Sequence, residues 1–151
     1  TLELTLAGEK IDTKLRLSLR EGTVYYFAHH TLTSLEPHYF IVVNSDPITQ
    51  KVLLAGVVTS KVDKAKLRRK SCLETLVEMD ETSFDILTKP SVVDCNDLKE
   101  IPLSEFNARF AVGKIKYFDK DLPMALRKEL RKAIHASTIL SDEQKALVAK
   151  P

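Results

Sequence analysis

The chain has 151 residues, a length that fits one domain. Hydrophobic residues make up 44% of it and charged residues 29%, with only 4 glycines and 6 prolines, so a disordered or collagen-like chain is excluded. The formal net charge is +2, and no stretch reaches the roughly 18 consecutive apolar residues of a membrane-spanning helix. We therefore expect a globular protein that does not cross a membrane.

The start of the chain and its two cysteines bear on location and redox state. The chain begins Thr1-Leu2-Glu3 and shows no basic and apolar leader, so we expect no secretory signal and a cytoplasmic location. Cys72 and Cys95 lie far apart and outside any CxxC spacing, which argues against a metal site and leaves free thiols or a disulfide open. We favour free thiols, because unpaired cysteine usually behaves as a small buried hydrophobe.

Charge is distributed unevenly along the middle of the chain. Residues 61–70 carry six bases against one acid, whereas residues 74–85 carry five acids and no base. We interpret residues 61–70 as a basic loop beside an acidic one. Such runs are usually solvated faces, and the alternative is a loop that attracts phosphate groups over a groove.

The first part of the chain shows no single pattern. Alternating leucines at residues 2–6 are typical of a strand, whereas Leu15 and Leu19 recur at helical spacing. We therefore treat residues 1–21 as an N-terminal extension and residues 22–151 as the main domain.

A series of short strands follows this extension. These segments are rich in β-branched and aromatic residues and are separated by turn residues. Repeated short strands without long helices between them favour an antiparallel barrel or sandwich over a parallel α/β sheet. The predicted strands cover residues 23–27, 39–43, 51–60, 75–79, 91–95, 100–103 and 110–118.

The C-terminal third changes to a helical period. Asp121 is placed to cap a helix whose first turn holds Pro123, and apolar residues recur at three and four positions over residues 122–134. Ser141 with Gln144 forms a capping-box pattern, which predicts a second short helix running nearly to the last residue.

The histidines are the strongest candidates for proton transfer. The sequence contains no GxGxxG, GxxxxGK[ST], HExxH, GxSxG or CxxC motif, which disfavours nucleotide hydrolysis, zinc proteolysis and α/β-hydrolase chemistry. His29, His30 and His38 lie within one short stretch. Adjacent histidines point to opposite sides of an extended chain, so a shared metal site is not expected. A single imidazole poised near neutral pH is favoured instead.

Small polar residues end one of the predicted strands. Thr59-Ser60-Lys61 follows the apolar run Gly56-Val57-Val58 and places hydroxyls and an ammonium where that strand leaves the core. Ordinary strand-end and turn chemistry also places such residues there, so the pattern alone does not establish a site.

Five segments in chain order, taken together, carry a family resemblance. They are Gly22-Thr23-Val24, Ile41-Val42-Val43-Asn44, Val58-Thr59-Ser60-Lys61, Lys89-Pro90-Ser91-Val92-Val93 and Ile101 to Phe106, followed by the C-terminal helix. This arrangement resembles the MazF/PemK-type toxins of toxin–antitoxin pairs over roughly residues 22–134.

The resemblance implies both a fold and an activity. The implied fold is mainly β, an SH3-like antiparallel β-barrel with C-terminal helices, usually assembled as a homodimer. The implied activity is that of a toxin-like endoribonuclease that cleaves single-stranded RNA without a metal or other cofactor. A cognate antitoxin is a possible partner.

The resemblance also carries residues over, with one departure. The active-site threonine of the family falls on Thr59. The family's arginine, which usually precedes a proline, falls at or beside His38, where the sequence reads Glu36-Pro37-His38-Tyr39. Either His38 takes the role of cation and proton donor, or the catalytic site has been lost and the fold reused. We predict His38 and Thr59 as the catalytic pair.

Substrate binding is predicted for the residues around this pair. The loop that holds two adjacent histidines matches the variable loop that contacts RNA in the family. The strand end after Thr59 and the basic segment supply further groups for phosphate oxygens. The predicted substrate-binding residues are His29, His30, Ser60, Lys61, Arg68 and Arg69.

The implied reaction needs only a few chemical groups from the protein. RNA supplies its own nucleophile, the 2′-hydroxyl, so the protein provides a base, an acid for the departing 5′-oxygen, and donors for the charge on phosphorus. Tyr25, Tyr26 and Tyr39 are candidates to stack unpaired bases, with burial in the core as the alternative.

Three functions stay open at this point. We favour the RNA-cleaving enzyme. The second candidate is a non-catalytic module of the same fold that binds nucleic acid or a partner protein through the basic segment, and the third is a structural interaction domain. A steep loss of binding with added salt would support either nucleic-acid function.

Overall fold

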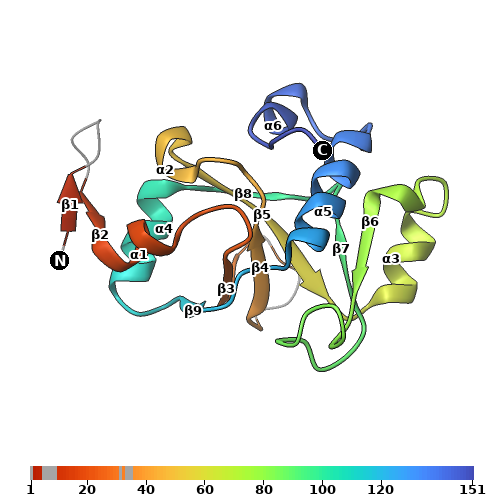
Figure 1. Ribbon diagram of the computed structural model, residues 1–151, viewed down its shortest axis with the longest axis horizontal. Helices are drawn as coiled ribbons and strands as arrows, with labels where there is room; N and C mark the ends of the chain where they lie inside the picture. The colour runs from red at the N-terminus through yellow and green to blue at the C-terminus, as the bar shows by residue number, and fades with distance from the viewer. Residues whose placement is uncertain (1, 5–9, 31, 33–35) are drawn as a thin grey trace.

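β-branched and aromatic residues build the strands of the central sheet, because such side chains pack well on a pleated, half-buried surface. Figure 1 shows the computed structural model of the chain, which describes residues 2–4, 10–30, 32 and 36–151. The central sheet contains β3 (Val24–Phe27), β4 (His38–Val42), β5 (Val52–Thr59), β6 (Leu76–Met79), β7 (Ser91–Asp94), β8 (Lys99–Pro102) and β9 (Lys116–Phe118).

The strands of this sheet pair antiparallel in the order β6-β7-β5-β4-β3-β9. β8 pairs with the first half of β5, along the same edge that β7 takes at the end of β5. The predicted antiparallel architecture is therefore confirmed, within a mixed α/β molecule. The predicted barrel is not confirmed, because β6 and β9 end an open path among the described strands.

The N-terminal segment contains both kinds of structure that its pattern suggested. β1 (Leu2–Leu4) pairs with β2 (Lys10–Asp12), and α1 (Thr13–Ser18) follows directly. The Asp12 side chain begins α1 by accepting hydrogen bonds from the first-turn backbone. Leu6, part of the alternating pattern, lies outside the described residues. The division between an extension and a main domain stays a prediction.

The core lies on both faces of the sheet, because successive side chains of a strand point to opposite sides. On one face, Val24 and Ile41 pack with apolar residues of α5 (Met124–Ala136). On the other face, Tyr25 and Phe40 pack with α1 and with α4 (Leu103–Ala111). Figure 1 shows α1 and α4 toward one end of the molecule and α3 toward the other.

The predicted basic loop is a helix, α3 (Val62–Arg68). The prediction of a loop was wrong because the segment has no apolar stripe, and Ala65 is the buried residue of this helix. Lysine, alanine, leucine and arginine nevertheless all favour helix. Lys66 pairs with Glu78 of the acidic segment at 3.0 Å, so one of the bases is neutralised there.

The predicted strand over residues 110–118 was also wrong in its first half. α4 ends at Ala111, and Gly113 turns the chain with a φ of 79°, a conformation that favours glycine. Leu103 and Phe106 recur at helical spacing and are buried, which explains the helix. Only the last three residues of the predicted strand form β9.

The C-terminal helices agree with the sequence except at their ends. α5 begins after Pro123, and Asp121 does not cap it; the Asp121 carboxylate instead pairs with Arg20 at 2.9 Å. The capping box of Ser141 and Gln144 is confirmed, although the helix it begins is shorter than predicted. The remaining helical elements are α2 (Pro47–Gln50), the 3-10 turn Leu73–Thr75 and α6 (Asp142–Ala146).

Two further expectations concern cysteine and membranes. Cys72 and Cys95 are free thiols, and Cys95 is buried, as the sequence predicted for structural cysteines. None of the helices in the described ranges has the length and apolar character needed to span a bilayer.

Candidate active site

A cavity of about 180 Å³ opens where the ends of β4 and β5 meet α3 and the segment that joins β7 to β8. It lies on the face of the sheet that also carries Tyr25 and Phe40, because Phe40 pairs with Val57 and Val57 lines the cavity. The side chains that matter for chemistry here are His38, Thr59, Lys61, Lys64, Arg68, Asp94, Asp97 and Lys99.

The strand register brings His38 and Thr59 together. β4 and β5 pair Tyr39 with Val58, and the same register continued by one residue places His38 opposite Thr59. Directly opposite residues of an antiparallel pair share one face of the sheet. Both residues line the cavity, so the structure unites the two positions that the sequence singled out. Their catalytic role stays a prediction.

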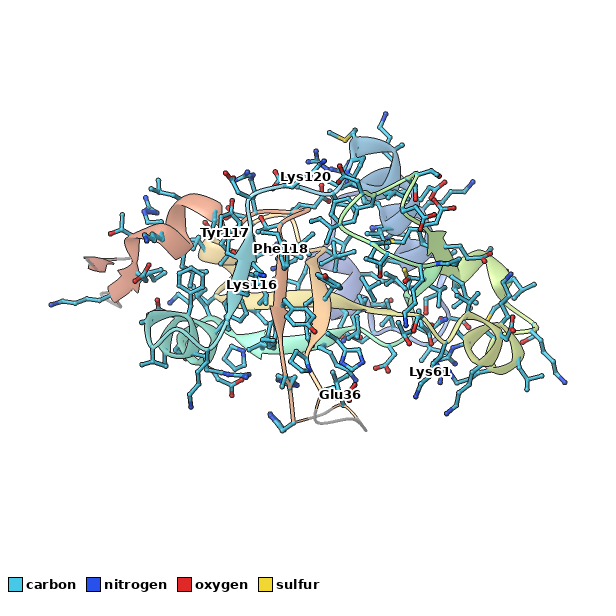
Figure 2. All side chains as sticks on the ribbon, turned by 90° about the horizontal axis from the view of Figure 1, so that it is seen from below. Glu36, Lys61, Lys116, Tyr117, Phe118 and Lys120 are labelled. Atoms are coloured by element: carbon cyan, nitrogen blue, oxygen red, sulfur yellow. The ribbon has the colours of Figure 1, made fainter. Side chains whose placement is uncertain are left out.

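The imidazole of His38 is oriented by the backbone. Its Nδ1 lies 2.9 Å from the carbonyl oxygen of Glu36. A carbonyl oxygen only accepts, so Nδ1 carries the proton and Nε2 of the neutral ring is an acceptor. His38 is half-buried, and Figure 2 shows Glu36 just before the start of β4. The ring is therefore held in the tautomer that can take a proton at Nε2.

The hydroxyl of Thr59 is oriented by the turn into α3. Its Oγ1 accepts a hydrogen bond of 3.2 Å from the backbone N–H of Lys61. A threonine hydroxyl has one proton and two lone pairs, so this contact leaves the O–H proton for another acceptor. Thr59 therefore makes the turn contact expected of a residue at a strand end and also keeps a hydroxyl proton that it can donate at the cavity.

Helix α3 lines the cavity with positive charge. Lys61, Lys64 and Arg68 follow one another at three and four residues, a spacing that places them on one face of a helix. Lys61 and Lys64 make no ion pair within the described ranges, and Figure 2 shows Lys61 beside α3. These two ammonium groups are available to an anion.

The opposite wall carries one further cation and two carboxylates. Lys99 pairs with Asp97 at 3.1 Å, and Arg68 pairs with Asp94 at 3.3 Å. The cavity therefore carries more positive than negative charge, because Lys61 and Lys64 make no ion pair with a carboxylate of the described residues. A positively charged cavity attracts phosphate groups.

Asp94 fixes the end of α3. Its carboxylate accepts from Arg68 and from Arg69, at 3.0 Å, on one oxygen, and from the backbone and side chain of Asn96 on the other. Burial by itself would raise the pKa of Asp94, but the hydrogen bonds from Asn96 and the charge of Arg69 together lower it. Asp94 is thus a charged anchor for the helix that carries the cavity's lysines.

Several residues of this site were missed from the sequence. A helix prediction for residues 61–70 would have identified Lys64 as a site residue, because Lys64 shares a helix face with Lys61 and Arg68. Asp94 and Lys99 reach the cavity because β7 and β8 pair with β5. Strand pairing between residues that lie far apart in the chain leaves no signal in the local sequence.

The other predicted binding residues lie outside the lining of this cavity. Ser60 is exposed next to the cavity. Arg69 contacts one of the residues that line the cavity, Asp94, but is not itself part of the lining. His29 is 5% exposed and packs near the ring of Phe27, whereas the neighbouring His30 is exposed. Residues 31 and 33–35 of the same loop lie outside the described ranges. The binding roles of Ser60, Arg69, His29 and His30 stay predictions.

Burial alters the chemistry of His29 and of Tyr25. Burial, followed by the charges of His30 and Arg109, lowers the pKa of His29 below its ordinary value. Tyr25 is fully buried, and its hydroxyl lies 3.2 Å from Ser18 Oγ, so its suggested role in stacking on a base was wrong.

Tyr26 and Tyr39 belong to the other face of the sheet. They pair across β3 and β4, with ring centroids 4.8 Å apart. Because Tyr39 is the neighbour of His38 along the strand, its side chain points away from the cavity. Among the described residues, no group of three or more His, Cys, Asp and Glu side chains is arranged to hold a metal ion.

Comparison with known proteins gives structural matches only. No family model and no curated protein sequence matches the chain. A solved endoribonuclease in complex with its cognate antitoxin, from mycobacterial species, superposes with a TM-score of 0.48 at 15% identity, covering 77% of this chain and 90% of that one. The Mycobacterium tuberculosis toxin MazF-mt6 superposes with a TM-score of 0.48 at 17% identity, covering 76% and 94%. The solved structures similar to this chain thus include a MazF toxin, a member of the family that the sequence segments resemble.

Proposed function

We propose that this chain is a toxin-type endoribonuclease that cleaves single-stranded RNA by attack of the RNA's own 2′-hydroxyl. The observation that carries the proposal is one cationic cavity in which an imidazole and a hydroxyl stand on paired strands. The resemblance of the segment around Thr59, and of Ile41 to Asn44 at the end of the strand that begins at His38, to MazF/PemK-type toxins supports the same activity.

His38 serves as the general base. Its Nε2 takes the proton of the 2′-hydroxyl, whose oxygen then forms a bond to phosphorus while the bond from phosphorus to the 5′-oxygen breaks. The products are a 2′,3′-cyclic phosphate and a 5′-hydroxyl. A positioned base of this kind contributes about 10²- to 10⁴-fold in rate.

The leaving oxygen needs a different proton donor. Attacking and leaving oxygens lie roughly in line on opposite sides of phosphorus, so the base that receives the first proton is poorly placed to supply the second. The ammonium groups of Lys61 and Lys64 lie on the wall of the cavity contributed by α3. One of them supplies the proton to the 5′-oxygen in this proposal.

Thr59 and the cavity's cations hold the phosphate. The Thr59 O–H donates to a non-bridging oxygen, and Arg68 and the lysines balance the charge that grows on phosphorus. Loss of one well-placed donor typically lowers the rate by about 10²- to 10³-fold. The reaction drawn in this way uses no metal, as the resemblance implies.

The missing arginine supports a second candidate. Where the family usually has an arginine before proline, this chain has Glu36-Pro37-His38. A cavity with unpaired lysines suits a nucleic-acid-binding module that does no chemistry equally well. An SH3-like fold and a homodimer belong to both candidates, and a cognate antitoxin belongs to the toxin.

Incubation of the purified protein with single-stranded RNA in EDTA tests the proposal. The expected result is cut RNA whose fragments end in a 2′,3′-cyclic phosphate, detected by mass spectrometry. Tight binding with intact RNA would favour the non-catalytic module. Cleavage that appears only when Mg²⁺ is added, leaving a 5′-phosphate, would contradict the mechanism.

A further inference from the structure

A second cavity, of about 610 Å³, lies beside the ends of β3 and β9. Arg109, Lys114 and Lys116 line it, and none of its described lining residues is acidic. The rest of the wall is largely apolar and includes Tyr26 and Pro37, whereas Phe27 lies behind it and is only 2% exposed. This cavity therefore combines three cations with an apolar surface, and the proposed reaction does not use it.

The cations of the second cavity are held without carboxylates. Arg109 donates from Nη2 to the carbonyl oxygen of Ala28 at 2.6 Å, and its guanidinium lies 5.3 Å from the centre of the Phe27 ring. The Lys116 ammonium lies 5.0 Å from the centre of the Phe118 ring. None of the three cations makes an ion pair within the described part of the chain, so their charge is available to a ligand.

The two cavities flank the same strand end. Phe27 of the second cavity pairs with His38 of the first, and Pro37 directly precedes His38. Neighbouring strands lie about 4.8 Å apart, so Phe27 and Thr59 are separated by roughly 10 Å across the sheet. Figure 2 shows Lys116 on β9, on the far side of β3 from Glu36 and Lys61. Lys116 pairs with Tyr26 and so belongs to the face of the sheet opposite His38. A strand bound at His38 would therefore reach the second cavity by passing around the end of β3.

We propose that the second cavity binds the continuation of the same single-stranded RNA, with Lys114 and Lys116 on its phosphates and the apolar wall against a base. This inference rests on the proposed function. An acidic peptide fits three cations equally well by charge alone. The pairing of Phe27 with His38 favours RNA, because it puts the cavity next to the site at which the proposed function binds an RNA strand.

The test compares two double variants that lose the same charge. Lys114→Ala with Lys116→Ala removes two cations from the second cavity, and Lys128→Ala with Lys132→Ala removes two exposed cations from α5. Binding is measured by fluorescence anisotropy. One RNA is short enough to occupy only the first cavity, and two others are extended by several nucleotides, one on the 5′ side and one on the 3′ side. Thermal unfolding checks the fold, and Lys114→Glu is the second variant should the loss of Lys116 destabilise β9.

We expect extension on one side, and not the other, to tighten binding of the wild-type chain. The Lys114/Lys116 double variant should lose about tenfold in affinity for that extended RNA and nothing for the short RNA. Its slope of log affinity against log salt should fall by about 1.4, because each phosphate contact on a single strand contributes about 0.7. The α5 double variant should match the wild type.

Two results would overturn the inference, and both differ from failure of the proposed function. Extension that brings no gain in affinity, or equal losses in the two double variants, would exclude the second cavity as an RNA site. An acidic peptide that binds there while extended RNA does not would assign it to a protein partner. Wild-type protein that binds extended RNA through this cavity but never cuts it would leave the inference standing and remove the nuclease.

Discussion

His38 and Thr59 stand opposite each other at the ends of β4 and β5, one residue beyond the pairing of Tyr39 with Val58. Neither side chain is free to turn at random, since Nδ1 of His38 contacts the Glu36 carbonyl and Oγ1 of Thr59 accepts from the Lys61 N–H. The lone pair of Nε2 and the hydroxyl proton are the two groups that remain for a substrate.

Thr59→Val removes this hydroxyl and keeps the shape of the side chain. We expect kcat to fall by about 10²-fold with little change in KM, because the lost donor acts chiefly on charge that develops during the reaction. Thr59→Ser is the matched control, and it should restore most of the rate. Steady-state kinetics that show a raised KM at unchanged kcat would place Thr59 in ground-state binding instead.

Asp94→Asn tests the anchor of α3. The variant keeps the size of the side chain but removes the negative charge that pairs with Arg68 and Arg69. We therefore expect a loss of about 1–3 kcal/mol in the free energy of unfolding. Asp97→Asn is the control, because Asp97 is 57% exposed and its pair with Lys99 contributes roughly 0–1 kcal/mol. Urea denaturation that gives equal losses for both variants would argue against the anchor.

Lys64→Ala tests the anion-binding role of the cavity. We expect RNA binding to weaken and the salt slope to fall by about 0.7, the value for one phosphate contact on a single strand. Lys66→Ala removes the same charge from the same helix at a position that pairs with Glu78 outside the cavity. If the Lys66 variant weakens binding as much, general charge of α3 rather than the cavity attracts RNA.

His29 gives the protein a pH dependence. Its pKa lies below the ordinary value of 6.5, so between the lowered pKa and 6.5 the unfolded chain binds more protons than the folded chain. Stability should therefore fall as the pH drops below about 6.5 and be fully present above it. The nearby charges act in both directions, because Glu105 raises this pKa while His30, Arg109 and Lys99 lower it.

The measurement is the midpoint of thermal unfolding across pH 5 to 8. His29→Phe, which keeps an aromatic ring in the same packing against Phe27, should flatten the acid side of the profile. His30→Phe alters the exposed neighbour and should leave most of the slope. A wild-type profile that is flat over this range would contradict the prediction.

Local sequence patterns were sufficient to predict some helices and strands but not others. β4, β5 and the capping box of Ser141 could be predicted because β-branched runs and cap residues carry their signal in adjacent positions. α3 could not, because Ala65 is its buried residue and no apolar stripe marks the helix. α4 was missed because its first residue was assigned to a predicted strand over residues 100–103 and its last two to a predicted strand over residues 110–118.

In the candidate site, too, some residues could be predicted from the local sequence and others could not. His38, Thr59 and Lys61 could be chosen because they lie at strand ends next to recognisable segments. Asp94 and Lys99 could not, since their place depends on the pairing of β7 and β8 with β5. His29 and His30 were grouped with His38 because they are close in the chain, yet strand β4 begins at His38 and carries only that histidine to the cavity.

Single-turnover cleavage by His38→Ala, with RNA affinity measured in parallel, tests the nuclease most directly. We predict that the variant loses about 10²- to 10⁴-fold in cleavage rate while its affinity for RNA changes little, because a general base acts on the reaction and not on binding. His38→Gln, which keeps an amide near the position of Nε2 but takes up no proton at neutral pH, should be equally slow. Cleavage at the wild-type rate by either variant would show that the proton of the 2′-hydroxyl is removed by another group.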